Sequence, residues 1–190
     1  VPIWDRGTVA GGMAEFMGVS GAASGGRELL PQADLVLLLG AAADYRVGYL
    51  QAPGLNAQAR VIKVDVDLGR LGEKRLVELE IQADPAVVLE QLHAVCNRRQ
   101  MDGFKDWLAA ARELGDEFQG QAIKGAVREN GLHALDIIEV LEEVLSPEAV
   151  VVVDGGNIGQ WFHQTLGRRS YPGHYLTCGA SGVVGYGIAG

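Results

Sequence analysis

Glycines next to an aspartate and an asparagine form the strongest chemical pattern in this sequence. An apolar run at 149–153 leads directly into Asp154-Gly155-Gly156-Asn157, and helical periodicity follows. In an open α/β sheet, ligands bind beyond the carboxyl ends of strands, and glycine lets the backbone approach them closely. The start of a helix adds free N–H donors and the positive end of its dipole. The pattern predicts a phosphate site, and an ordinary tight turn is the alternative.

A second group of glycines follows at Gly179, Gly182, Gly185 and Gly187. Small residues at this spacing predict a helix start that another flat surface can touch. Val184 is a bulky apolar residue just before Gly185, and such a side chain can prop a bent ligand. Close packing of a helix on a strand is the alternative. Together the two glycine groups favour a bound diphosphate more than either does alone.

Weaker signals for an anionic ligand lie earlier in the sequence. Asp65 and Asp67 follow an apolar run, where a carboxylate often hydrogen-bonds a ribose. The preceding run ends in Gly40-Ala-Ala-Ala-Asp44, which lacks the Gly-x-Gly-x-x-Gly fingerprint, so surface aspartates are the favoured interpretation. Arg46 could reach an anionic ligand or form a surface pair.

Several function classes are disfavoured by composition and spacing. The four histidines lack the spacing of a zinc site, and no serine lies in a Gly-x-Ser-x-Gly elbow. The net charge of −8 argues against a nucleic-acid partner. No apolar run reaches the about 18 residues of a membrane span. Two cysteines and the lack of a signal peptide favour a cytoplasmic protein with free thiols.

Hydrophobic periodicity places these motifs in an α/β fold. Apolar runs at 35–39, 61–66 and 77–82 predict strands, and their continuous apolar character indicates a mostly parallel sheet covered on both faces. Asp84-Pro85 predicts a helix start, because aspartate is a good N-cap and proline suits the first position. The buried face of this helix is expected at Val88, Leu89, Leu92 and Val95.

Three segments are predicted along the chain: a partial sheet domain at 1–96, a helical linker at 97–132, and a second α/β domain at 133–190. Apolar residues recur at helical spacing in the linker and predict one amphipathic helix. The last segment predicts helix, strand, helix and strand in that order, with the strands at 149–153 and 175–177.

These residues together resemble the thiamine-diphosphate enzymes, most of all the acetolactate synthase group. Two sets of stretches carry the resemblance, the first to the family's central domain and the second to the start of its diphosphate-binding domain. The first set is 34–40, 44–46, 61–67 and 83–85, and the second is 151–161 and 177–190. The resemblance implies a Rossmann-like parallel sheet, followed by the truncated start of a second α/β domain.

The resemblance also implies roles for residues of the last segment. The turn that touches the diphosphate is matched by Gly155, Gly156, Asn157 and Ile158. Gly182 matches the glycine whose carbonyl accepts a hydrogen bond from the aminopyrimidine. Val184 matches the bulky residue that holds the cofactor in a V shape.

In the first segment, the resemblance implies contacts of Asp65, Val66 and Asp84 with FAD or ADP, and it places Arg46 near the substrate channel. The implied cofactors are thiamine diphosphate and Mg²⁺. The family's Gly-Asp-Gly metal motif is expected about 20–30 residues beyond Gly190. No catalytic residue is assigned, because the family's catalytic glutamate lies on a domain that this sequence does not include.

The function implied by the resemblance is that of a 2-keto acid decarboxylase or carboligase. Such an enzyme acts on a small 2-keto acid or acyl substrate and is expected as a homodimer or homotetramer. A CoA-thioester decarboxylase or a C–C hydrolase of the same superfamily stays open, as does a nucleotide-binding regulatory or non-catalytic assembly module. We expect the 190 residues to be a fragment that is inactive by itself, since the metal motif and the glutamate are missing from them.

Overall fold

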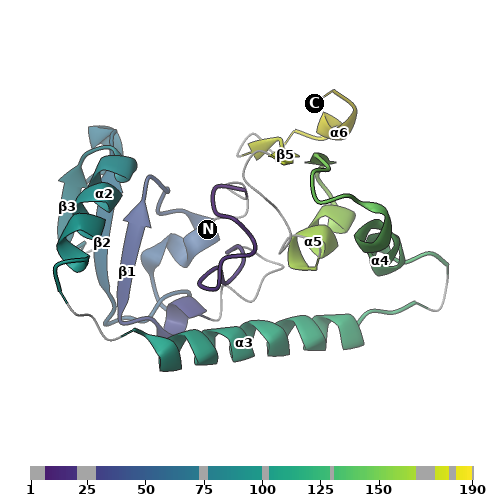
Figure 1. Cartoon of the computed structure of the whole chain (residues 1–190), viewed down its shortest axis with the longest axis horizontal. Helices are drawn as coiled ribbons and strands as arrows, with labels where there is room; N and C mark the ends of the chain where they lie inside the picture. Colours follow the sequence, from purple (N-terminus) through teal and green to yellow (C-terminus); the bar gives the residue numbers. More distant parts are fainter. Residues whose placement is uncertain are drawn as a thin grey trace. The chain divides into compact units, whose positions relative to one another are not determined.

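The computed structural model describes residues 7–20, 29–72, 77–99, 103–128, 131–165, 174–179 and 183–189. The chain divides into two compact units, whose elements are labelled in Figure 1. We call Glu28–Ala109 the sheet unit, and Val1–Arg27 with Ala110–Gly190 the turn unit. The domain boundaries expected at 96 and 132 stay a prediction.

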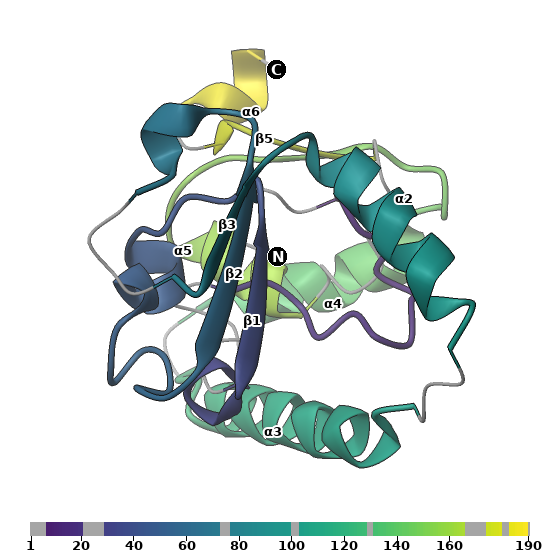
Figure 2. The same ribbon diagram turned by 90° about the vertical axis from the view of Figure 1, so that its left-hand side faces the viewer.

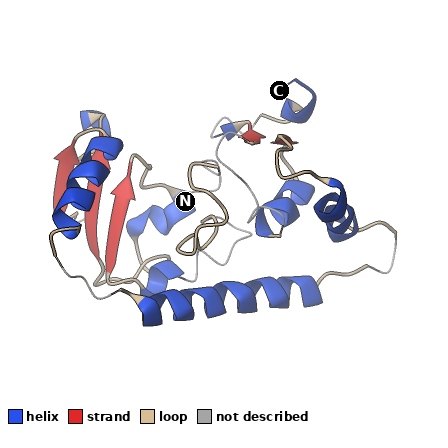
Figure 3. Cartoon of the chain, viewed as in Figure 1, coloured by secondary structure: helices blue, strands red, loops and turns tan. Residues whose placement is uncertain are grey.

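The sheet unit is built on three parallel strands in the order β1-β2-β3. These strands are β1 (Leu35–Leu39), β2 (Arg60–Asp65) and β3 (Leu79–Gln82), drawn in red in Figure 3. Ile62 of β2 lies between its partners Leu37 and Leu79 in the register. The predicted parallel α/β sheet is confirmed, and each strand lies within a residue or two of its apolar run.

A different layer packs on each face of this sheet. Successive side chains of a strand point to opposite faces, so neighbouring residues contact different layers. Val61 and Leu38 pack against the short helix η3 (Tyr45–Leu50) in the core of the unit. Val64 points to the opposite face, where helix α2 (Pro85–Cys96) lies. Figure 2 shows α2 on one side of the strands and the segment that contains η3 on the other. Two further short helices are η2 (Leu30–Gln32) and η4 (Leu68–Arg70).

The start of α2 was predicted correctly, but most of its expected burial was wrong. The Asp84 carboxylate accepts a hydrogen bond from the Ala86 N–H at 2.8 Å, and Pro85 is the first helical residue. Val88 is buried, whereas three other residues of the apolar face are 40–47% exposed: Leu89, Leu92 and Val95. Leu35 and Leu37 of the sheet are exposed as well. The reason is the width of the sheet, since three strands are too narrow to cover the whole apolar face of a helix.

The predicted amphipathic helix is α3 (Lys105–Lys124). Its expected stripe is unevenly covered: Ala111 is buried, while Phe104, just before the helix, is 67% exposed. None of the helices in the described ranges has both the length and the apolarity needed to cross a membrane.

The turn unit contains a pair of parallel strands, β4 (Val151–Val153) and β5 (Tyr175–Thr177). Helix α4 (Ala134–Val144) precedes β4, α5 (Asn157–Gln164) follows it, and α6 (Tyr186–Ala189) comes last. Its core consists of Ile138, Val153, Phe162 and Tyr175. The predicted order of helix, strand, helix and strand is therefore correct. Leu166, which continues the apolar periodicity that follows Asn157, lies outside the described residues.

Candidate functional site

The carboxylate of Asp154 joins two glycine turns that are far apart in the sequence. It follows β4, and its Oδ1 accepts a hydrogen bond from the Gly155 N–H at 2.7 Å. The Gly185 N–H lies 3.1 Å from Oδ1 and 2.9 Å from Oδ2. The turn after β4 and the turn before α6 therefore meet at one carboxylate.

These contacts affect the ionisation of Asp154. The hydrogen bond from the Gly155 N–H is the largest cause of the change, and N–H groups of Gly185, Tyr186 and Gly187 act in the same direction. Because they stabilise the charged form, they hold the pKa of Asp154 below its ordinary value, against a smaller opposing effect of desolvation. The side chain is therefore an acceptor for backbone N–H groups at neutral pH.

Glycine is required by the backbone in both turns. Gly156 has φ +99° and Gly185 has φ +91°, a region that L side chains rarely adopt. Gly156 is also the residue that caps α5, and it contributes no side-chain hydrogen bond to the helix start. This leaves room for an external anion at the N–H groups of the first turn.

The other predicted diphosphate contacts lie at the same turn. Asn157 and Ile158 are the first two residues of α5, and both are exposed. A Cβ built on Gly155 would lie 4.0 Å from Cγ2 of Val184, so Val184 is next to the start of the turn. Val184 itself is 84% exposed. Gly182 lies outside the described residues. The structure thus brings five predicted residues together: Gly155, Gly156, Asn157, Ile158 and Val184.

The remaining predicted residues belong to the sheet unit, near the carboxyl ends of its strands. Asp65 is 2% exposed, its Oδ1 accepts from the Asp67 N–H at 3.0 Å, and its Oδ2 is 3.9 Å from Arg70. The buried Lys63 donates to the Arg70 carbonyl, which ties η4 to β2. Val66 is exposed, and Asp84 caps α2. Asp65 and Asp84 therefore both have structural contacts.

Arg46 forms a partly buried ion pair with Asp44. Its Nε lies 3.0 Å and 2.9 Å from the two carboxylate oxygens, and a terminal nitrogen lies 2.7 Å from Oδ2. Burial raises the pKa of Asp44, but the hydrogen bonds and the charge of Arg46 together outweigh it and hold that pKa below its ordinary value. The Arg46 side chain is 10% exposed, so Arg46 pairs with Asp44 as expected, but in a mostly buried position rather than at the surface.

One buried polar pair was missed by the sequence analysis. His163 of α5 and Tyr175 of β5 are 5% and 6% exposed, and the tyrosine hydroxyl lies 2.8 Å from Nδ1 of the histidine. Phe162 stacks on Tyr175 with ring centroids 5.9 Å apart. A histidine next to an aromatic residue in an amphipathic helix was the only local signal. Its partner depends on how α5 packs on β5.

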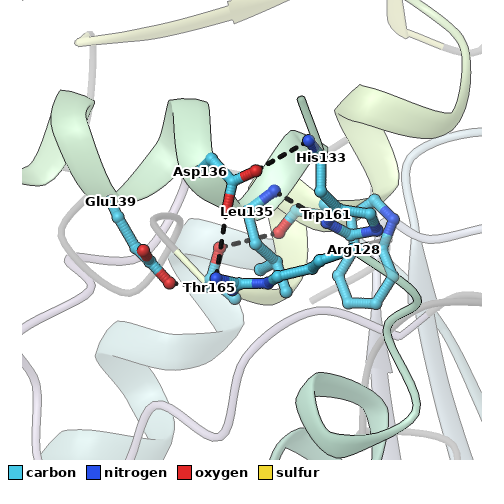
Figure 4. A network of polar contacts seen from close by, with 7 residues as sticks. All are labelled: Arg128, His133, Leu135, Asp136, Glu139, Trp161 and Thr165. Carbon is cyan, nitrogen blue, oxygen red and sulfur yellow. Dashed lines mark hydrogen bonds and ion pairs between the residues drawn. The ribbon is translucent and has the colours of Figure 1, made fainter. Parts of the chain in front are cut away.

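A second polar network, shown in Figure 4, stabilises the start of α4. His133 Nδ1 accepts from the Leu135 N–H at 3.1 Å, and Asp136 accepts from the His133 N–H at 2.7 Å. Arg128 lies 3.0 Å from Asp136 and 2.9 Å from Glu139. These contacts form a capping box with a cation beside it. In the described ranges, no group of three or more His, Cys, Asp or Glu residues could hold a metal ion.

Comparison with known proteins gives consistent matches. Residues 4–92 match the thiamine pyrophosphate enzyme central domain. Acetolactate synthase of Mycobacterium bovis is 28% identical over 163 residues, which cover 84% of this chain and 26% of that protein. The acetolactate synthase isozyme 1 large subunit of Escherichia coli is 28% identical over 161 residues, 84% of this chain and 27% of that protein. 2-Hydroxyacyl-CoA lyase 2 of Caenorhabditis elegans is 26% identical over 169 residues, 85% of this chain and 26% of that protein.

Residues 4–92 belong to the thiamine-diphosphate enzyme family as its central domain. The resemblance to the acetolactate synthase group is thereby confirmed. Within this family, most of the sheet unit corresponds to the central domain. An alignment over 163 residues extends well beyond that match, so it includes part of the turn unit. The chain spans about a quarter of the length of the curated relatives it matches.

Proposed function

We propose that the full-length natural protein is a thiamine-diphosphate-dependent 2-keto acid decarboxylase or carboligase of the acetolactate synthase type. The observation that supports it most is the meeting of two glycine turns at Asp154, in a chain whose residues 4–92 belong to the thiamine-diphosphate family. Two of the relatives named above are acetolactate synthases, which favours this type. A small 2-keto acid is the proposed substrate, and a cytoplasmic homodimer or homotetramer the proposed form.

In this proposal, the start of α5 binds the diphosphate. The uncapped N–H groups after Gly156 donate to phosphate oxygens, and the dipole of the eight-residue helix favours the negative charge. The exposed side-chain amide of Asn157 donates a further hydrogen bond. When bound, thiamine diphosphate supplies an electron sink for the carbanion that decarboxylation leaves. The residues of this chain contribute binding and orientation.

Val184 and Gly182 are proposed to orient the cofactor's rings. Val184 lies next to Gly155 and is open to solvent, so its methyl groups are available to an apolar ligand surface. Gly182 is proposed to accept a hydrogen bond from the aminopyrimidine through its carbonyl. Mg²⁺ is proposed to bind with the diphosphate. The described residues lack a metal-binding cluster of their own, so most of its ligands are expected from the diphosphate and from other residues.

A flavin or adenine nucleotide at the sheet unit fits the observed contacts less well. Asp65 is almost wholly buried, and its carboxylate faces the Asp67 N–H and Arg70. The Asp84 carboxylate already accepts from the Ala86 N–H. Val66 and Asp84 are both exposed, but the Asp84 carboxylate is occupied in capping α2. The proposed reaction therefore includes no step that uses FAD or ADP.

A second candidate function is the cleavage or formation of an acyl-CoA substrate. The match to 2-hydroxyacyl-CoA lyase 2 covers as much of this chain as the acetolactate synthase matches do. The residues of the proposed site contact the cofactor, so they do not distinguish between the two substrate classes. An assay of both substrate classes therefore separates the two candidates.

The test is isothermal titration of the full-length natural protein with thiamine diphosphate and Mg²⁺. Asn157→Ala should raise the Kd about tenfold by removing one hydrogen bond to a charged group. Asn97→Ala, at an exposed asparagine after α2, is the matched control and should leave the Kd unchanged. Release of carbon dioxide from pyruvate would support the first function, and cleavage of a 2-hydroxyacyl-CoA the second. No heat of binding in the wild type would overturn both.

A further inference from the structure

We propose that Asp154 is a positioning residue that holds the two glycine turns at a fixed spacing, so that both contact one cofactor molecule. This inference rests on the proposed function and extends it to a residue that contacts neither the diphosphate nor the rings in that proposal. Asp154 is separated from Gly185 by 31 residues in the sequence. Among the described residues, its carboxylate accepts hydrogen bonds from both turns and so links them.

The geometry supports a fastening role for this side chain. One oxygen accepts from the Gly155 N–H, which orients the carboxylate, and both oxygens lie within hydrogen-bond distance of the Gly185 N–H. A Cβ built on Gly187 would lie 3.3 Å from Cβ of Asp154, so the start of α6, just after the second turn, lies directly against the aspartate. Hydrogen bonds from N–H groups to a carboxylate are stronger than those between neutral groups.

The position of Val184 depends on this contact. Val184 is 84% exposed, so packing against the rest of the unit contributes little to holding it in place. It directly precedes Gly185, whose N–H is bound by Asp154, and it lies next to Gly155 on the other turn. Releasing Gly185 would therefore let Val184 move relative to the start of α5. A ligand that contacts both turns would then lose a preorganised site.

Charge gives an independent argument. A carboxylate close to a diphosphate site repels the ligand, and an apolar or amide side chain would avoid that cost. The oxygens of Asp154 are already directed at backbone N–H groups of both turns, which offset its negative charge locally. The hydrogen bonds of Asp154 therefore offset its repulsion of the diphosphate. The same hydrogen bonds join the two turns.

The experiment uses the full-length natural protein, four single variants, and the double variant that combines Asp154→Ala with Gly185→Ala. Asp154→Ala removes the contact, Asp154→Asn keeps one acceptor oxygen, and Gly185→Ala strains the second turn at φ +91° without touching the carboxylate. Glu148→Gln removes one exposed carboxylate of the same unit and serves as the charge control. Amide hydrogen exchange without cofactor is measured first, and the Kd for thiamine diphosphate at fixed Mg²⁺ second.

Asp154→Ala should speed exchange of the Gly185 amide about tenfold and raise the Kd by a similar factor, the effect of one charge-assisted hydrogen bond. Asp154→Asn should restore part of both effects, and Glu148→Gln should change neither. Gly185→Ala should raise the Kd, and adding it to Asp154→Ala should have little further effect, because both act on one contact. A general loss of stability would not produce this rescue and non-additivity.

Three outcomes would overturn the inference, and they point to different causes. If the wild type binds no thiamine diphosphate, the proposed function fails and this inference fails with it. If the wild type binds and Asp154→Ala changes neither the Kd nor the exchange at Gly185, only the positioning role is wrong. Faster exchange at Gly185 with an unchanged Kd also rejects the role, because the turns would then be joined for a reason unrelated to the cofactor.

Discussion

Gly159 lies where α5 passes close to the end of β4. A Cβ at this position would lie 2.8 Å from the carbonyl oxygen of Asp154 and 3.5 Å from Cγ1 of Val153. A backbone oxygen cannot move away cheaply, so Gly159→Ala should lower the free energy of unfolding by about 1–3 kcal/mol. Urea unfolding measures this change. Gly120→Ala in α3, where a Cβ meets nothing within 4 Å, should instead stabilise the chain by about 0.5–1 kcal/mol. Equal shifts of the two variants would contradict the prediction.

The pair of Asp44 and Arg46 predicts a dependence of stability on pH. Arg46 holds the folded pKa of Asp44 below its ordinary value, so the pair stabilises the fold above the unfolded pKa, about 3.9. That stability is lost as the pH falls through the folded pKa. Arg46→Met should therefore lower the free energy of unfolding at pH 7 by about 1 kcal/mol and weaken its fall in acid.

Unfolding of both proteins in urea between pH 7 and pH 2.5 would measure the effect. The control is Arg60→Met, which breaks the exposed pair with Glu78, and exposed pairs contribute little. A steeper acid dependence in Arg46→Met than in the wild type would show that the sign is wrong.

Single residues in the sequence predicted contacts with near neighbours in the chain, but not contacts between distant segments. The capping role of Asp84 and the glycine turn after β4 were predictable, because each depends on neighbours within a few residues. The contact of Asp154 with Gly185 was not, because it needs the packing of two segments 31 residues apart. The pairing of His163 with Tyr175 also depends on tertiary packing.

At the scale of elements, periodicity predicted which segments form strands and helices but not what covers them. The run at 35–39 has the continuous apolar character of a buried strand, yet Leu35 and Leu37 are exposed at the edge of a three-stranded sheet. Helix α2 likewise has exposed residues on its apolar face. An apolar stripe indicates a face that can be buried, and the number of neighbouring strands decides how much of it is.

The first turn of α2 allows a test at this scale. Asp84→Ala removes the side-chain acceptor for the Ala86 N–H and should lower the free energy of unfolding by about 1 kcal/mol. Asp84→Ser keeps a capping oxygen and should retain most of the stability. Thermal unfolding followed by circular dichroism compares the two variants. If alanine and serine destabilise equally, the charge of Asp84 rather than its capping bond is what stabilises the helix.

At the scale of the whole molecule, the family match and the site lie in different parts of the chain. The central-domain match ends at residue 92, whereas the two glycine turns lie in the turn unit. The sheet unit has a core of its own around Leu38 and Val61, and the turn unit has another around Ile138 and Phe162. Binding of a diphosphate cofactor should therefore protect the turn unit more than the sheet unit.

This division gives a prediction for ligand-linked stability of the full-length natural protein. A ligand that binds only the folded state at 100 times its Kd stabilises by about 2.7 kcal/mol. We expect thiamine diphosphate with Mg²⁺ to raise the Tm accordingly, and removal of the metal with EDTA to reverse the rise. Thiamine monophosphate, which lacks the second phosphate, should stabilise much less because it offers fewer acceptors to the start of α5.

Hydrogen exchange should show new protection at 154–159 and 183–187 and little change at 35–65. Protection confined to the sheet unit would place the ligand at the ends of β1–β3 instead, and the two glycine turns would then be structural only.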